Sequence, residues 1–240
     1  MDSTLAELIR ISRKVGTDET LVQGGGGNTS VKTPDEKFMY IKASGTPLKD
    51  MNEVKGWRRV GISSLLELLM DDDLSKISPA KREQRVMTSL SAACDDALKT
   101  EARPSVETHL HATLDRCVIH LHPDAVGAYV NAKNGKTLLE KIFRDEKLPP
   151  LWIPYTDPGF TLAKKTARFV EKYRKQHGKK PRILFLEKHG LFVSAATAAA
   201  ALRTTHSVID KCMGRLKPVK TSRLMSADKA VINETKLALR

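Results

Sequence analysis

The stretch Cys117-Val118-Ile119-His120-Leu121-His122-Pro123 combines a short apolar run, two histidines and a terminal proline. Its composition predicts a strand over 117–122 that ends at the proline. Residues two apart point to the same face of a strand, so His120 and His122 can reach one cation while Ile119 and Leu121 face the core. The stretch therefore predicts a core strand that carries two metal ligands.

The apolar residues on either side of this stretch follow helical periodicity in some segments and strand periodicity in others. Helices are predicted over 5–15, 63–70, 82–99, 124–132, 137–143, 162–175 and 196–216, and strands over 37–43, 182–186 and 191–194. Such alternation is typical of an α/β fold in which helices cover both faces of a sheet.

A carboxylate and another histidine pair precede the metal-binding strand. After Pro104, Ser105 can cap a helix that has Glu107 in its first turn. Residues two apart on a helix diverge by about 200°, so His109 and His111 are not expected to share a metal. Glu107 and His111 are four apart and would lie on one helix face. A short connection can therefore bring Glu107 to the predicted metal ligands.

His189 is the third candidate ligand. It follows the apolar run 183–186 and precedes Gly190, a position from which a neighbouring strand could complete a three-histidine site. Three neutral imidazoles leave a divalent cation its full charge and one open position, which suits polarisation of a carbonyl group and stabilisation of an enediolate. Glu107 would then move the proton as an acid/base.

Four glycines, 24–27, precede Asn28-Thr29-Ser30, and we interpret this segment as a polar loop between the first helix and the sheet. Backbone N–H groups there, with Asn28 and Ser30, could cradle a phosphate, and Ala43-Ser44-Gly45-Thr46 offers a second anion-binding turn. A flexible turn explains the glycines as well. No Gly-Lys-Ser/Thr follows, so the loop is not a Walker A motif, and the order of elements does not fit a dinucleotide fingerprint.

The length and the net charge of the chain limit its domain organisation and the classes of partner that it can bind. The 240 residues are divided into one domain over 1–216 and a polar, basic extension over 217–240. The net charge of +13 favours an anionic partner, either a phosphorylated metabolite or nucleic acid. The basic residues are scattered and aromatic residues make up only 5%, so we expect a metabolite and no nucleic acid. Affinity for nucleic acid that falls steeply with salt would support the alternative.

Apolar runs and cysteines bear on the location. No run approaches the roughly 18 apolar residues of a membrane-spanning helix, and the first residues do not resemble a signal peptide. The three cysteines are widely spaced and form no CxxC pair. The sequence therefore predicts a cytoplasmic protein without a membrane partner.

Five motifs follow one another along the chain: Gly26-Gly27-Asn28-Thr29-Ser30, Ala43-Ser44-Gly45-Thr46, Pro104-Ser105-Val106-Glu107 with His111, His120-Leu121-His122-Pro123, and Lys188-His189-Gly190-Leu191. Together, and in this order, they resemble the class II aldolase/adducin family from about residue 5 to residue 216. The segment Ile153-Pro154-Tyr155-Thr156-Asp157-Pro158-Gly159 is similar to one found in aldolase modules associated with rhamnulose-phosphate breakdown. The histidine motifs are specific to the family, though not to one substrate.

The resemblance implies a three-layer α/β/α sandwich with a central, largely antiparallel sheet. It also implies a homotetramer with active sites at subunit boundaries. His120, His122 and His189 would bind Zn²⁺, with Mn²⁺ or Co²⁺ as other candidate cations. Glu107 would be a fourth ligand in the empty site and the acid/base once substrate displaces it. The residues that would hold the substrate phosphate are Gly27, Asn28, Ser44, Gly45 and Ser105.

The activity implied by the resemblance is that of an aldehyde-lyase in carbohydrate metabolism. A zinc-dependent aldolase would cleave or form a carbon–carbon bond in a small phosphorylated ketose, or a related hydroxy-carbonyl compound, through a metal-bound enediolate. Dihydroxyacetone phosphate and a short aldehyde would be the products. An epimerase, dehydratase or decarboxylase of the family would use the same residues. An adducin-like binding domain would keep the fold without metal chemistry, but retention of Glu107 and the three histidines argues against it.

Two positions depart from the pattern of fuculose-type aldolases. Val106 stands where those enzymes have a second serine, so a differently phosphorylated or unphosphorylated substrate stays open. Those enzymes also use a tyrosine near the C-terminus to protonate the aldehyde oxygen, whereas no tyrosine follows Tyr173 here. Tyr155 is the candidate substitute, and packing in a proline-bounded turn is an alternative role for it.

Overall fold

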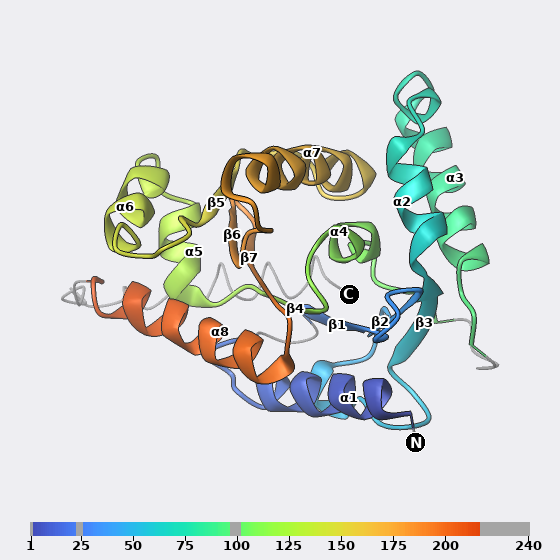
Figure 1. Ribbon diagram of the computed structural model, residues 1–240, viewed down its shortest axis with the longest axis horizontal. Coiled ribbons are helices and arrows are strands. Elements are labelled where there is room, and N and C mark those ends of the chain that lie inside the picture. Colours follow the sequence, from blue (N-terminus) through green and yellow to red (C-terminus); the bar gives the residue numbers. More distant parts are fainter. Residues whose placement is uncertain (1, 23–25, 97–101, 217–240) are drawn as a thin grey trace, which may run out of the picture.

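A seven-stranded mixed sheet forms the centre of the protein in a computed structural model that describes residues 2–22, 26–96 and 102–216 (Figure 1). The strand order is β3-β2-β1-β4-β7-β6-β5. Within the described residues β5 pairs with β6 in parallel, and the other neighbours are antiparallel. The strands are β1 (Asn28–Lys32), β2 (Phe38–Lys42), β3 (Trp57–Gly61), β4 (Cys117–Leu121), β5 (Leu151–Ile153), β6 (Ile183–Leu186) and β7 (Gly190–Ala195).

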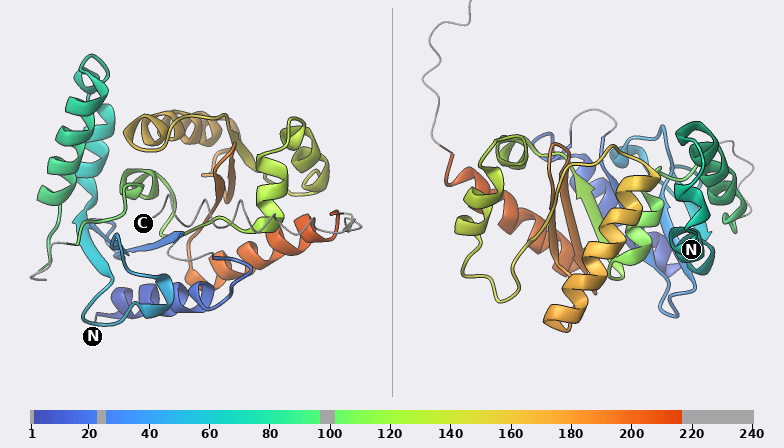
Figure 2. Two further views of the ribbon diagram at one scale, coloured as in Figure 1. Left: turned by 180° about the vertical axis from the view of Figure 1, so that it is seen from behind. Right: turned by 90° about the horizontal axis from the view of Figure 1, so that it is seen from above.

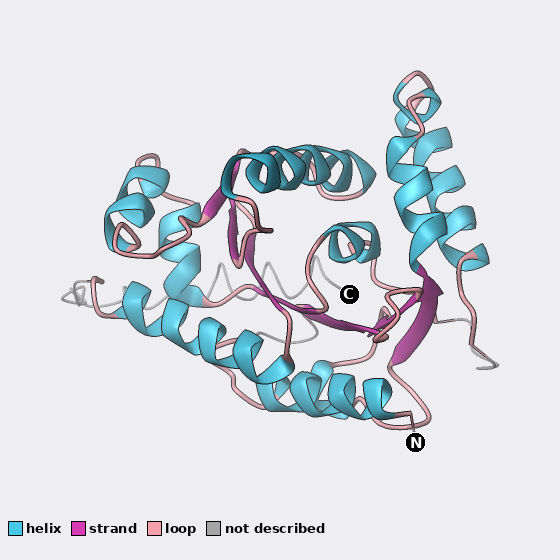
Figure 3. Ribbon diagram, viewed as in Figure 1, coloured by secondary structure: helices cyan, strands magenta, loops and turns pink. Residues whose placement is uncertain are grey.

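Helices cover both faces of this sheet, as Figure 3 shows, so the predicted three-layer α/β/α architecture is confirmed. On one face lie α1 and α8, and on the other lie α4 and α7 (Figures 1 and 2). The helices are α1 (Ser3–Gly16), α2 (Ile62–Met70), α3 (Pro79–Ala92), α4 (Thr108–Thr113), α5 (Asp124–Val130), α6 (Gly135–Ile142), α7 (Phe160–His177) and α8 (Ala198–Met213), with short 3-10 turns at Leu48–Asp50 and Asp73–Ser75. Next to β3, α2 and α3 lie side by side and project from the body (Figure 1).

Local sequence explains where the helices on the α1 face begin and how they pack. The α1 helix buries Leu5, Leu8, Ile11 and Val15, which recur at the three- and four-residue spacing of one helix face. The Asp2 carboxylate accepts a hydrogen bond from the Thr4 N–H and caps its start, as the Thr197 hydroxyl does for α8 by accepting from the Ala200 N–H.

The central strand β4 sends alternate side chains to the two layers. Cys117, Ile119 and Leu121 are buried in one hydrophobic cluster with residues of α1 and α8. Val118 is buried in a second cluster with residues of α4 and α7, and His120 faces the same side. The predicted alternation therefore holds, and it places His120 beneath the start of α4.

Several predicted boundaries are wrong. The segment Asn28-Thr29-Ser30 is not part of a loop but lies in β1, which pairs with both β2 and β4. The sequence analysis did not predict β3 or β5. The helix predicted over 82–99 ends at Ala92, and part of its predicted range lies outside the described residues, as does the predicted extension 217–240. No helix in the described part of the chain is long and apolar enough to cross a membrane.

Candidate metal centre

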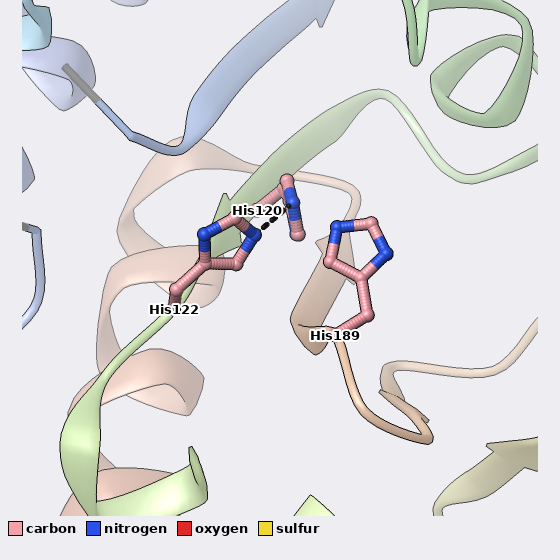
Figure 4. A group of neighbouring side chains, drawn as sticks. All are labelled: His120, His122 and His189. Carbon is pink, nitrogen blue, oxygen red and sulfur yellow. Dashed lines mark hydrogen bonds between the residues drawn. The ribbon is translucent and has the colours of Figure 1, made fainter. Parts of the chain in front are cut away.

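Three histidine side chains converge at one end of the central strands (Figure 4). His120 lies in β4, His122 follows that strand, and His189 precedes β7. The antiparallel pairing of β4 with β7, in which Leu121 lies opposite Leu191, brings the three together. One ring nitrogen from each lies within 4.8 Å of the others, and the Nε2 atoms of His120 and His122 are 2.9 Å apart.

The hairpin between β6 and β7 fixes the position of His189. Its N–H donates to the Leu186 carbonyl at 3.1 Å, and the Lys188 N–H donates to the Val130 carbonyl at 2.9 Å. Lys188 adopts the left-handed conformation, with φ of 54°. A Cβ atom on Gly190 would lie 2.5 Å from Cδ2 of His122, so the glycine leaves room for the neighbouring imidazole.

Hydrogen bonding and burial prepare the histidines for metal binding. Nδ1 of His120 lies 2.9 Å from the Leu191 carbonyl, which can only accept, so Nδ1 carries a proton and Nε2 is the nitrogen that faces the other candidate ligands. The His120 ring stacks on Phe192 with 4.0 Å between centroids. Burial lowers the pKa of His122 to about 4, and burial also lowers the pKa of His189. Both side chains are therefore neutral near pH 7.

Glu107 lies against this cluster as the residue that caps α4. Its Oε2 is 3.2 Å from Nε2 of His120, and its Oε1 is 3.3 Å from Nε2 of His189. Asn28 Nδ2 donates to Oε2 at 2.7 Å. Burial acts to raise the pKa of Glu107, but the attraction and hydrogen bond of His120, with the Asn28 hydrogen bond, lower it overall. Three neutral imidazoles and one carboxylate are a donor set that fits a divalent cation such as zinc.

The predicted start of the α4 helix is corrected by two positions, because the N-cap residue is Glu107 and not Ser105. The helix begins at Thr108, so Glu107 is its N-cap residue and not part of its first turn. Ser105 does not cap the helix itself: its Oγ accepts from the Glu107 N–H at 3.3 Å. His111 and His109 diverge as predicted. His111 contacts Asn28 at 2.5 Å, whereas His109 packs edge-on against Phe160 with centroids 6.1 Å apart.

The residues predicted to hold a phosphate lie in two places, one beside β4 and one next to the segment before Glu107. Gly27 and Asn28 lie beside β4, since Asn28 is opposite His120 and a Cβ on Gly27 would lie 2.8 Å from the His120 carbonyl. The turn with Ser44 and Gly45 pairs with the segment before Glu107: the Ser44 N–H donates to the Arg103 carbonyl at 2.7 Å. The Ser105 N–H donates to the carbonyl of residue 42 at 3.1 Å, so Ser105 adjoins that turn.

A sequence profile of the class II aldolase and adducin N-terminal domain matches residues 6–213. The chain belongs to this family. An uncharacterized oxidoreductase from Bacillus subtilis (strain 168), YuxG, is 32% identical over an alignment of 213 residues that covers 85% of this chain. The chain spans only 28% of the length of that relative.

Solved structures of this family share the fold. The N-terminal class II aldolase domain of a conserved protein from Thermoplasma acidophilum is 28% identical, with a TM-score of 0.72 over 89% of this chain and 94% of that one. An L-fuculose 1-phosphate aldolase is 19% identical, with a TM-score of 0.56 over 89% of this chain and 84% of that one. The second likeness is one of fold alone.

Lys42 is a residue of this site that the sequence analysis missed. It ends β2, two positions before Ser44, and its side chain is buried. Burial lowers its pKa, while attraction to Glu107 acts in the opposite direction, so the lysine is electrostatically coupled to the acid/base candidate. A lysine at the end of an otherwise apolar strand, directly before the turn predicted to bind an anion, was the signal that could have identified it.

Proposed function

We propose that this family member is a zinc-dependent class II aldolase that cleaves or forms a carbon–carbon bond in a small phosphorylated ketose. The observation that carries the proposal is the arrangement of His120, His122 and His189 within 4.8 Å, with the two oxygens of Glu107 at 3.2 and 3.3 Å from two of their nitrogens. A purely structural domain has no need of three buried or half-buried imidazoles around a carboxylate, because burying such groups is unfavourable.

The three histidines hold the cation in this proposal, and Glu107 moves the proton. A zinc ion supplies a Lewis acid that polarises the oxygens of the ketose. In the cleavage direction the Glu107 carboxylate accepts the proton of the hydroxyl group on the departing carbon as the carbon–carbon bond breaks and the aldehyde forms. The carbon that keeps the electron pair of the broken bond then takes a proton, with Glu107 as the donor. The burial of Glu107 excludes water from this transfer.

Charge and space near the histidines support a small phosphorylated substrate. A cavity of about 410 Å³, lined by His122, His189, Gly190 and residues of α5, opens next to the histidine cluster and is within the size range of small-molecule sites. In the proposal, the phosphate lies near Lys42 and the turn with Ser44 and Gly45. A cation there compensates the charge of the phosphate, and Gly27, Asn28 and Ser105 complete the predicted pocket.

The first test is the metal content of the protein purified without a histidine tag. We expect about one zinc per chain, and loss of that zinc in the double variant His120→Ala/His122→Ala. The matched control replaces His177 and His206, which lie outside the cluster, and should keep the metal. Wild-type protein that stays free of metal after incubation with Zn²⁺, Mn²⁺ and Co²⁺ would overturn the proposal in favour of an adducin-like binding role.

Product analysis then distinguishes the reactions that this site can support. An aldolase releases dihydroxyacetone phosphate and a short aldehyde from its ketose phosphate, and a coupled assay detects the triose phosphate. An epimerase changes the configuration of the sugar without releasing an aldehyde, and a decarboxylase releases carbon dioxide. Light scattering tests the proposed homotetramer, because a monomer that is fully active would contradict active sites at subunit boundaries.

A further inference from the structure

One face of β1 carries three polar side chains that contact α4 and the residue that caps it. Asn28 contacts Glu107, Ser30 contacts His111, and Lys32 donates to the carbonyls of Ala112 and Leu114 at the other end of the helix. Two residues of a strand advance by about 6.6 Å, and four residues of a helix rise about 6 Å. The strand and the helix therefore keep the same register from Glu107 to His111.

The hydrogen bonds along this face have a single consistent direction. Glu107 is a carboxylate and can only accept, so the amide nitrogen of Asn28 donates to its Oε2 at 2.7 Å. The amide oxygen of Asn28 must then accept from Nε2–H of His111, 2.5 Å away. Nδ1 of the neutral His111 is left with a lone pair, and it accepts from the Ser30 hydroxyl at 2.7 Å. Burial lowers the pKa of His111 to about 3, in accord with a neutral ring.

We propose that Ser30 and His111 are positioning residues that act through Asn28 on the Glu107 carboxylate. The inference rests on the proposed function, since it assigns their role to the acid/base of that site. The Ser30 hydroxyl, as a donor to Nδ1, stabilises the tautomer of His111 that donates from Nε2, and this tautomer in turn stabilises the orientation of the Asn28 amide that donates to Glu107. The amide holds Oε2, and Oε1 is left without a hydrogen bond among the described residues, facing His189 at 3.3 Å. One oxygen is thereby anchored and the other faces the metal ligands.

Loss of the Ser30 hydroxyl should affect the Glu107 carboxylate through the His111 ring and the Asn28 amide. Without that donor, the buried lone pair on Nδ1 has lost its partner, so the tautomer with the proton on Nε2 is less favoured and His111 can place its proton on Nδ1. Nε2 would then repel the amide oxygen of Asn28, and a flipped amide would turn its oxygen toward Glu107. Two oxygens that both carry lone pairs repel each other, so the carboxylate would lose its anchor.

Matched controls exist on the same two elements. Thr29 is equally buried, but it faces α1, where its hydroxyl is 2.6 Å from that of Ser12. His109 is buried on α4, and neither ring nitrogen has a hydrogen-bond partner among the described residues. Thr29→Val and His109→Phe therefore disturb β1 and α4 without touching the contacts of Asn28.

The first experiment measures the affinity and visible spectrum of bound Co²⁺ in purified protein. We expect Ser30→Ala and His111→Phe to weaken binding about tenfold and to change the cobalt spectrum, as outer-shell partners of metal sites do. Ser30→Thr, which restores a hydroxyl, should recover the wild-type values. Thr29→Val and His109→Phe should stay within about twofold of wild type. Equal effects of Ser30→Ala and Thr29→Val would overturn the proposal while leaving the metal site intact.

The second experiment is independent of metal and of turnover. Long-range ¹H–¹⁵N NMR of the metal-free protein reports which ring nitrogen of His111 carries the proton. We expect Nε2–H in the wild type and in Ser30→Thr, and a mixture or the opposite tautomer in Ser30→Ala. A proton on Nδ1 in the wild type would overturn the positioning role even if zinc and aldolase activity are found. If His111 carries its proton on Nε2 but the protein binds no metal, the proposed function fails while the hydrogen-bond order from Ser30 to Glu107 is still supported.

Discussion

The two faces of β1 and β4 are equally buried but differ in chemistry. Toward α1 and α8 the strands present Val31, Ile119 and Leu121, which pack into one hydrophobic cluster. Toward α4 they present Asn28, Ser30, Lys32 and His120, each with a polar partner. Burial of polar groups is unfavourable unless each is hydrogen-bonded. The α4 face therefore adds less to stability than the apolar face, but its hydrogen bonds hold the polar side chains in one defined arrangement. We therefore expect substitutions on the α4 face to change chemistry and those on the α1 face to change stability.

The largest effect is expected at Glu107. Glu107→Gln keeps the shape of the side chain but removes the group that transfers the proton, so turnover of the ketose phosphate should fall about 10²–10⁴-fold. The three histidines remain, so the protein should still bind zinc. The measurement combines triose phosphate release with metal analysis. Glu67→Gln, on the exposed face of α2, is the control, and a Glu107→Gln variant with more than a tenth of wild-type turnover would contradict the assigned role.

The α1 face should respond in stability. Ile119 is 1% exposed and packs in the hydrophobic cluster with residues of α1 and α8. Ile119→Ala therefore removes core contacts and leaves a cavity. We expect the free energy of unfolding to fall by about 3–4 kcal/mol. Urea unfolding of the metal-free protein measures this loss, and Ile119→Val should show a smaller one. The folded variant should keep zinc, because Ile119 points away from the ligands. Loss of zinc with unchanged stability would reverse the comparison between the faces.

The contrast between the faces also explains what the sequence could predict. Alternation in β4 was sufficient to place His120 on the face opposite Ile119, because a strand has a fixed period of two. The role of β1 was missed because four glycines precede it, and Asn28, Thr29 and Ser30 are residues typical of turns. Those residues form a strand here because they pair with β2 and β4, which is information from distant parts of the chain.

The same limit applies to Glu107 and to the missed strands. The sequence predicted that Glu107 would approach the metal ligands, but its contact with Asn28 joins residues 79 positions apart and depends on the packing of α4 on the sheet. The β3 strand was missed because Arg58 and Arg59 interrupt its apolar pattern, and β5 has only three residues. Local patterns thus predicted which residue types carry the chemistry, and long-range pairing determined how they are held.

The smallest effect is expected at Lys32, at the far end of the polar face, and it depends on pH. Burial lowers the pKa of Lys32 to about 8, and the charge of Lys180 acts in the same direction, while Glu36 and Asp115 oppose it. An unfolded lysine has a pKa of about 10.4. Between these values the unfolded chain holds a proton that the folded chain has released, so the contribution of Lys32 to stability rises with pH over this range. Below about pH 8 both states hold the proton, and the destabilisation is fully present and constant. From pH 7.5 to 9.5 this group should contribute a gain of about 2 kcal/mol.

Urea unfolding of the metal-free protein at both pH values should show the gain in the wild type and in Lys37→Met, an exposed control, but not in Lys32→Met. Equal pH dependence in all three proteins would mean that the polar face of β1 holds Lys32 without an energetic penalty, and the contrast between the two faces would then be limited to the residues around Glu107.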